Sequence, residues 1–142
     1  MKITTVEELL SEFDDCLDRD ERLQLILELG DDLDPLPDEF KNEENRVRGC
    51  QSNVWLVSHA LPGTPVRLHF DADSDGQIVR GLIAILLSLV NDKTPAEIRA
   101  LDLDTIFKQL DLARYISHSR SNGLASMVKR VRDLAKCAEA AV

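Results

Sequence analysis

The sequence is poor in cysteine, with only three among its 142 residues, at positions 16, 50 and 137. An odd number of widely spaced cysteines does not make a disulfide framework. The sequence contains no Cys-x-x-Cys or His-x-x-His pair, so a structural zinc site is not expected. The fold therefore has to depend on an apolar core.

Long apolar runs and an excess of positive charge are also lacking. The longest apolar run, Leu82 to Val90, is too short to span a membrane, and Met1 to Thr5 has no apolar centre of the kind found in signal peptides. The 17 basic residues against 26 acidic residues give a net charge of −9, which argues against nucleic acid and anionic membranes as main partners. We therefore expect a cytoplasmic protein that binds neither nucleic acid nor a membrane.

The composition is that of an ordinary globular protein. Apolar residues make up 44% of the chain and charged residues 30%, and the length suffices for one core. The chain has no internal repeat, low-complexity segment or composition shift that would mark a boundary. We expect a single domain over residues 1–142.

Apolar residues at helical spacing predict six helices. They begin near Thr5, Asp20, Asp75, Thr94, Asp104 and Ser121. Thr5 with Glu8, and Thr94 with Glu97, have the spacing of a capping box. Gly30 is expected to end the second helix, and Ser74 or Asp75 to cap the third, which is apolar on most sides and therefore central. Gly81 within it indicates a close backbone approach, which we assign to the sheet.

Alternating and β-branched segments predict strands. Asn53 to Leu61 and Val66 to Asp71 flank a Pro-Gly turn, and Arg46 to Arg48 is a candidate short strand before them. Because the connections are short, the strands are expected to be antiparallel. The predicted fold class is α+β, a small antiparallel sheet of about three strands packed against several helices.

The acidic segment from Asp71 to Gly76 imitates the beginning of an EF-hand loop. A calcium loop of that type needs a bidentate glutamate at its twelfth position, where this sequence has Leu82. We therefore expect no metal at this segment or elsewhere in the chain.

Residues 48–55, with the sequence Arg-Gly-Cys-Gln-Ser-Asn-Val-Trp, are the most informative stretch. They place Cys50 behind a glycine and directly before a predicted strand, where a sulfur can be presented without being packed away. The nucleophile is a thiolate, and Arg48, His118 or Arg120 could favour it. A packing role for Cys50 remains open at this point, because free cysteines are often buried as small apolar residues.

Four segments in the same order resemble the SufE family of sulfur-acceptor, or cysteine desulfuration, proteins. They are residues 48–55, Asp73-Ser74-Asp75 followed by residues 78–82, Thr94-Pro95, and residues 119–124. The resemblance covers the chain from about Glu28 onward and implies a fold similar to the U-type iron–sulfur scaffold.

The resemblance implies that Cys50 takes a persulfide sulfur from a cysteine desulfurase of the SufS or CsdA type and stimulates that enzyme. The sulfur then passes to an iron–sulfur scaffold complex of the SufBCD type. This chain would hold no cofactor, because the pyridoxal phosphate (PLP) belongs to the desulfurase. The chain would thus be a sulfur-transfer partner rather than a stand-alone enzyme.

From the residues and the resemblance together we expect supporting or partner-binding roles around Cys50. These fall to Arg48, Gly49, Gln51, Asp73, Asp75, His118 and Arg120. We also expect the Cys50 loop to be hidden at rest and exposed on docking, since a persulfide is easily reduced or oxidised.

Three alternatives remain for the sequence. The first is a U-type iron–sulfur scaffold, which would need several ligands converging near Cys50. The second is a noncatalytic desulfurase-binding adaptor in which Cys50 is incidental. The third is a redox-sensing thiol that forms a stable sulfenic acid without a desulfurase.

Overall fold

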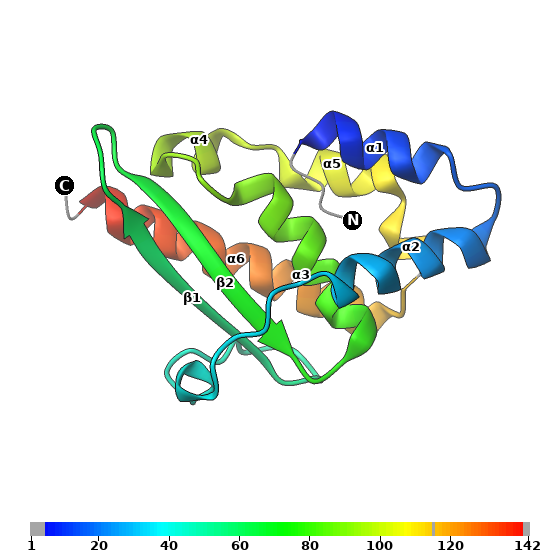
Figure 1. Ribbon diagram of the computed structural model, residues 1–142, viewed down its shortest axis with the longest axis horizontal. Coiled ribbons are helices and arrows are strands. Elements are labelled where there is room, and N and C mark those ends of the chain that lie inside the picture. The colour runs from blue at the N-terminus through cyan, green and yellow to red at the C-terminus, as the bar shows by residue number, and fades with distance from the viewer. Residues whose placement is uncertain (1–4, 115, 141–142) are drawn as a thin grey trace.

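The computed structural model describes residues 5–114 and 116–140, and it confirms the α+β class (Figure 1). In chain order the elements are α1 (Val6–Asp14), α2 (Arg19–Asp31), β1 (Val54–Leu61), β2 (Arg67–Ser74), α3 (Gln77–Val90), α4 (Pro95–Ala100), α5 (Leu103–Leu110) and α6 (His118–Ala140), with short 3-10 turns at Asp38–Phe40 and Leu112–Arg114. In Figure 1 the β1–β2 hairpin runs along one side of the molecule, α1, α2 and α5 form the other side, and α3 lies between them.

The sheet is a two-stranded antiparallel hairpin rather than the three strands expected. Its register pairs Val54 with Ser74 and Leu61 with Arg67. The predicted strand at Arg46–Arg48 is reduced to an isolated bridge between Arg46 and Trp55. Only a few backbone hydrogen bonds join this segment to β1, because the chain turns away at Gly49 to form the Cys50 loop.

Alternate residues of the hairpin face the core. On β1 these include Val54 and Leu56, and on β2 they include Leu68 and Phe70, all of them buried. The opposite face carries Trp55 and polar side chains. This period of two follows from the pleat, which sends successive side chains to opposite faces of the sheet.

The central helix α3 supplies the middle of the core and crosses α2 at close range. A side chain on Gly81 would meet the Ile26 carbonyl oxygen at 2.2 Å, and one on Gly30 would meet the Gly81 amide nitrogen at 2.7 Å. Gly81 therefore permits a close approach to α2. The approach to the sheet that the sequence led us to expect is wrong. Gly30 does not end α2 either, because it is needed inside the helix at this crossing and the helix continues to Asp31.

The helix ends agree with the sequence in part. The capping boxes were predicted at Thr5 and Thr94: the Thr94–Glu97 box is present in both directions, and Thr5 accepts the Glu8 amide. Gly76, rather than Ser74 or Asp75, stands at the N-cap of α3, because those two side chains bind other groups.

Two further helices begin earlier than the sequence indicated. Asp102 rather than Asp104 caps α5 by accepting the Thr105 amide. The last helix, α6, begins at His118 instead of Ser121, with Ser117 accepting the Arg120 amide. Within residues 5–114 and 116–140, no helix is both long enough and apolar enough to cross a membrane.

Candidate functional site

The loop from Arg48 to Asn53 carries the candidate nucleophile. It leaves the bridge at Arg46, turns at Gly49 with a φ of +89°, and rejoins the hairpin at Val54. A φ in this region strains a residue with a side chain, so glycine is favoured at position 49. The turn directs Cys50 toward α6.

The sulfur of Cys50 lies against the first turns of α6. Its Sγ donates to the Gly123 carbonyl oxygen at 3.5 Å, and a side chain on Gly123 would lie 3.4 Å from Sγ. A cavity of about 140 Å³ opens beside it. Its lining combines apolar Val79, Leu82 and Met127 with Gln51, Ser52, Ser117, Ser119 and Arg120.

Burial in this position raises the pKa of the Cys50 thiol above its ordinary value of 9.0, while the charge of Arg46 acts in the opposite direction. An apolar surrounding disfavours the charged thiolate, and a hydrogen bond from the thiol to a carbonyl also favours the protonated form. At neutral pH the resting Cys50 is therefore a thiol held against α6, with low intrinsic reactivity.

The structure brings some of the predicted site residues to Cys50 and leaves others away. Gln51 and Arg120 line the same cavity. Arg48 instead extends into solvent and pairs with Glu43 at 3.1 Å. Arg46 also pairs with Glu43, at 3.2 Å, and its charge lowers the pKa of the Cys50 thiol. His118 begins α6 as an exposed residue and does not line the cavity.

Asp75 holds the far end of the Cys50 loop. Its Oδ1 accepts the Asn53 backbone amide at 3.1 Å, and its Oδ2 accepts the Asn53 side-chain amide at 2.9 Å. Both oxygens thus act on the residue that joins the loop to β1. Because these hydrogen bonds are exposed, they compete with water and make a weak clamp.

Asp73 is only 2% exposed and belongs to the rigid part of the molecule. Its carboxylate accepts the amides of Ser74 at 2.8 Å and Leu36 at 3.2 Å, and it pairs with Arg80 and with Lys41. Burial by itself raises the pKa of Asp73, but the two amides and the two cations outweigh this effect and lower that pKa below 3.8.

Arg80 extends this anchor to α2. Its guanidinium also donates to the carbonyl oxygens of Leu33 at 3.0 Å and Gly30 at 3.3 Å. Asp73 and Arg80 together therefore tie β2, α3 and the segment after α2 to one another. Asp73 does not line the Cys50 cavity, so its contribution to the site is to fix the frame.

Sequence reasoning missed several residues that shape the site. Gly123 and Ser126 of α6 contact the Cys50 loop, and the charge of Arg46 lowers the pKa of the Cys50 thiol against the effect of burial. Gly123 falls within the segment 119–124 that carried the family resemblance, so its position was signalled but its contact was not. No pattern in the sequence pointed to Ser126.

The other two cysteines lie elsewhere. The Cys16 thiol donates to the Glu12 carbonyl oxygen at 3.4 Å, and burial followed by the charge of Glu21 raises its pKa. Cys137 is exposed near the end of α6. Neither residue lines the cavity at Cys50.

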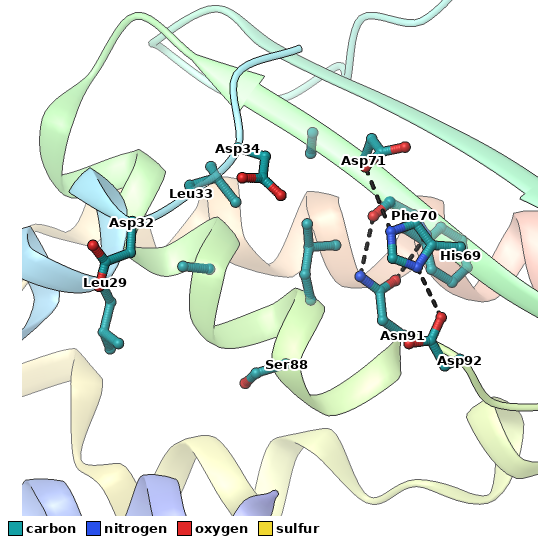
Figure 2. A pocket seen from close by; sticks show the side chains of 13 residues that line it. Leu29, Asp32, Leu33, Asp34, His69, Phe70, Asp71, Ser88, Asn91 and Asp92 are labelled. Atoms are coloured by element: carbon teal, nitrogen blue, oxygen red, sulfur yellow. Dashed lines mark hydrogen bonds and ion pairs between the residues drawn. The ribbon is translucent and has the colours of Figure 1, made fainter. Parts of the chain in front are cut away.

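A separate open cleft of about 290 Å³ lies between β2, α3 and the residues after α2 (Figure 2). In it His69 binds Asp92 through Nδ1 at 2.8 Å, and the Asn91 side chain pairs with the backbone of Phe70. Across the part of the chain that is described, no three His, Cys, Asp or Glu side chains are grouped closely enough to hold a metal ion.

The family profile and the related sequences that match this chain agree on one family. The profile of the family described as "SufE: Fe-S metabolism associated domain" matches residues 7–135. An uncharacterized SufE-like protein of Rhizobium etli is 42% identical over 141 residues, which cover 98% of this chain and 95% of that protein. A second uncharacterized SufE-like protein, from Rhizobium meliloti, is 36% identical over 135 residues, covering 94% and 96% of the two chains.

The fold is also similar to a solved structure. The solution structure of a hypothetical protein from Thermus thermophilus superposes with a TM-score of 0.77 and covers 99% of both chains. Its sequence identity is 18%, so this likeness concerns the fold alone.

Proposed function

This chain belongs to the SufE family, whose domain is associated with iron–sulfur metabolism, and on that premise we propose that it accepts sulfur from a cysteine desulfurase onto Cys50. The observation that carries the proposal is the position of Cys50. It lies on a loop turned by Gly49, half-buried at a small cavity and away from the other described cysteines.

The proposed reaction exchanges one sulfur–sulfur bond for another. The Cys50 thiol first loses its proton. The thiolate then attacks the outer sulfur of the persulfide on the desulfurase cysteine. A new bond forms between Cys50 Sγ and that sulfur, the bond to the desulfurase cysteine breaks, and its electron pair stays on the desulfurase sulfur. No net oxidation or reduction occurs, and the desulfurase thiolate takes up the proton.

The cavity beside Cys50 supports the second half of this role, which is to carry the sulfur safely. Its lining combines the apolar side chains of Val79, Leu82 and Met127 with Arg120 and several serines. The apolar side chains limit the access of water and of small thiols, and the cation of Arg120 favours a negatively charged outer sulfur. The space beside Sγ is large enough for one additional sulfur atom.

The resting geometry requires that Cys50 leave α6 before it can react. A buried thiol that donates to a carbonyl oxygen is protonated and screened, whereas attack on a partner's sulfur needs an exposed thiolate. We propose that docking of the desulfurase draws the loop outward. The contacts that hold the loop are weak, and this supports such a movement. They are the long hydrogen bond from Cys50 to the Gly123 carbonyl and the exposed hydrogen bonds from Asn53 to Asp75.

The remaining parts of the proposal concern the partners. PLP is held by the desulfurase, of the SufS or CsdA type, and this chain supplies the acceptor cysteine. The recipient of the sulfur is an iron–sulfur scaffold complex of the SufBCD type. The cytoplasm is the proposed place of action, because its thiol pools keep a free cysteine reduced.

Sulfur labelling tests the proposal directly. The protein is mixed with a cysteine desulfurase, PLP and sulfur-labelled cysteine, and the label is located by mass spectrometry without reduction. We expect a persulfide on the Cys50 peptide and faster desulfurase turnover, both lost in Cys50→Ser and both retained in Cys137→Ser. Label on no cysteine, with turnover unchanged across several desulfurases, would reject the proposal.

The same experiment separates the alternatives. If the protein were an adaptor, its Cys50→Ser variant would stimulate the desulfurase as well as the wild type does. A redox sensor would form a sulfenic acid at Cys50 without any desulfurase. An iron–sulfur scaffold would bind iron and sulfide with visible absorbance, although Cys50 has no neighbouring ligand set among the described side chains.

A further inference from the structure

Cys50 is held at rest by a small contact surface between its loop and α6, which we call the Cys50 seat. The Cys50 seat consists of Gly49 and Cys50 on the loop and Gly123 and Ser126 on α6. In it the Cys50 thiol donates to the Gly123 carbonyl oxygen, and Gly49 lies against the Ser126 side chain.

The contact at Ser126 is the tighter of the two. A side chain on Gly49 would place its Cβ 2.5 Å from Ser126 Oγ and 3.5 Å from Ser126 Cβ. The Ser126 hydroxyl is itself fixed, because it donates to the Asn122 carbonyl oxygen one turn earlier at 3.1 Å. The position of this hydroxyl therefore limits how closely the loop approaches α6.

The contact at Gly123 depends on that distance. A Cβ there would lie at an ordinary contact distance of 3.4 Å from Sγ, so the sulfur rests directly on the helix backbone. If the loop were lifted at Gly49, the sulfur on the next residue would leave the Gly123 carbonyl and the apolar side chains of the cavity. The charge of Arg46, which already lowers the pKa of the thiol, would then act with less opposition from burial.

From this geometry we infer that Ser126 is a positioning residue for sulfur transfer, which sets the resting position of Cys50 through its contact with Gly49. The inference rests on the proposed function for its biological meaning, but the contact can be tested without any sulfur transfer. It predicts that a larger side chain at position 49 unseats Cys50, and that trimming Ser126 restores the seated state.

The experiment measures the rate at which iodoacetamide alkylates Cys50 between pH 6 and pH 10, with exposed Cys137 as the internal reference. In Gly49→Ala we expect the Cys50 rate at neutral pH to rise about fivefold or more, as expected when a closed state loses roughly 1 kcal/mol. The midpoint of its pH profile should fall, because the sulfur leaves an apolar site.

The double variant Gly49→Ala/Ser126→Ala decides the role of Ser126. Removing the hydroxyl relieves the contact at 2.5 Å but not the strained φ at position 49, so we expect the rate and the midpoint to return more than halfway to the wild-type values. Ser126→Ala alone should lower the Cys50 rate below the wild-type value, because the loop can lie closer to α6 once the hydroxyl that limits its approach is gone.

A second variant keeps the inference testable if Gly49→Ala does not fold. Ser126→Leu introduces a good helix former that occupies the place of Gly49, and it should also raise the Cys50 rate. Ala125→Leu is the matched control, since Ala125 is exposed on the adjacent face of α6 and does not line the Cys50 cavity.

The outcomes are distinct. An unchanged Cys50 rate in Gly49→Ala or Ser126→Leu would overturn the seat, and a double variant as reactive as Gly49→Ala would overturn the role of Ser126. Failure of labelled sulfur to reach wild-type Cys50, with the alkylation pattern as expected, would reject the proposed function and leave the Cys50 seat intact.

Discussion

Glycine allows two pairs of segments to approach closely in this molecule. The two places differ in which atoms an added side chain would strike. At the crossing of α2 and α3, a side chain on Gly81 would strike the backbone of Ile26. At the Cys50 seat, a side chain on Gly123 would contact Cys50, and the atom nearest to it would be the sulfur. Backbone atoms of packed helices cannot move aside, whereas a thiol on a loop can.

The polar contacts of the two regions differ in the same way. Asp73 and Arg80 join β2, α3 and the segment after α2 through a buried network of amides, carbonyls and charges. The Cys50 loop has one long thiol hydrogen bond and an exposed clamp at Asp75. A rigid frame therefore carries a loop that is easily released, which is the arrangement that sulfur transfer between two proteins requires.

The same substitution in the two regions should give the largest contrast. Gly81→Ala forces α2 and α3 apart and should lower the free energy of unfolding by about 3 kcal/mol or more. Gly123→Ala should change it by less than about 1 kcal/mol, because alanine favours the helix and its Cβ fits beside Cys50. Urea denaturation checks both, and equal losses would contradict the distinction between frame and loop.

Removal of the Asp73 carboxylate should have the next largest effect. Asp73→Ala leaves Arg80 partly buried without its main partner, and we expect a loss of roughly 3 kcal/mol in the free energy of unfolding. Its effect on Cys50 alkylation, measured in the folded protein, should be small. A stable Asp73→Ala protein with a strongly exposed Cys50 would show that Asp73 holds the Cys50 loop in place rather than stabilising the frame.

The clamp at Asp75 should show the opposite pattern. Asp75→Ala removes two exposed hydrogen bonds from Asn53, so we expect a loss in the free energy of unfolding below about 1 kcal/mol. Cys50 alkylation should nevertheless increase, because one end of the loop is freed. Asp104→Ala, another carboxylate next to a helix start, is the control and should leave Cys50 alkylation unchanged.

The smallest expected effect is the dependence of stability on acid pH. Because the folded pKa of Asp73 is lowered, its contribution is fully present above the unfolded value of about 3.8 and is lost as the pH falls through the folded value. The free energy of unfolding of wild type should therefore decline more steeply below pH 4 than that of Asp73→Asn. Parallel curves for the two proteins would show that Asp73 has no depressed pKa.

The local pattern of the chain predicted the helices and the hairpin, but not the contacts between them. The spacing of apolar residues identified α3 as central and Phe70 as a core residue, since both follow from the period of one element. The expected end of α2 at Gly30 was wrong, because the crossing with Gly81 is a tertiary contact. The expected start of α6 at Ser121 was wrong because Ser117 accepts the Arg120 amide, a local cap that the sequence analysis did not consider.

The candidate site shows the same limit. Cys50 could be singled out because a glycine precedes it and a strand follows it. Its neighbours Gly123 and Ser126 could not, since Cys50 and its partner Gly123 are 73 positions apart in the chain. Of the three cations expected to favour the thiolate, Arg120 lines the Cys50 cavity, whereas Arg48 pairs with Glu43 and His118 does not line the cavity.

One measurement tests most directly whether Cys50 leaves α6 to attack a partner's sulfur. The catalytic cysteine of a desulfurase is capped as an aryl disulfide, and release of the aryl thiolate is followed on mixing with this protein. The same rate is measured with a free aryl disulfide at equal concentration. Cys50→Ser is the control for both reactions.

We expect Cys50 to form a disulfide with the desulfurase at least about tenfold faster than it reacts with the free reagent, since docking supplies both proximity and the exposed loop. The cross-linked peptide should contain Cys50. Equal rates with the two disulfides, or a cross-link through Cys137, would contradict the claim that the partner releases Cys50 from its seat.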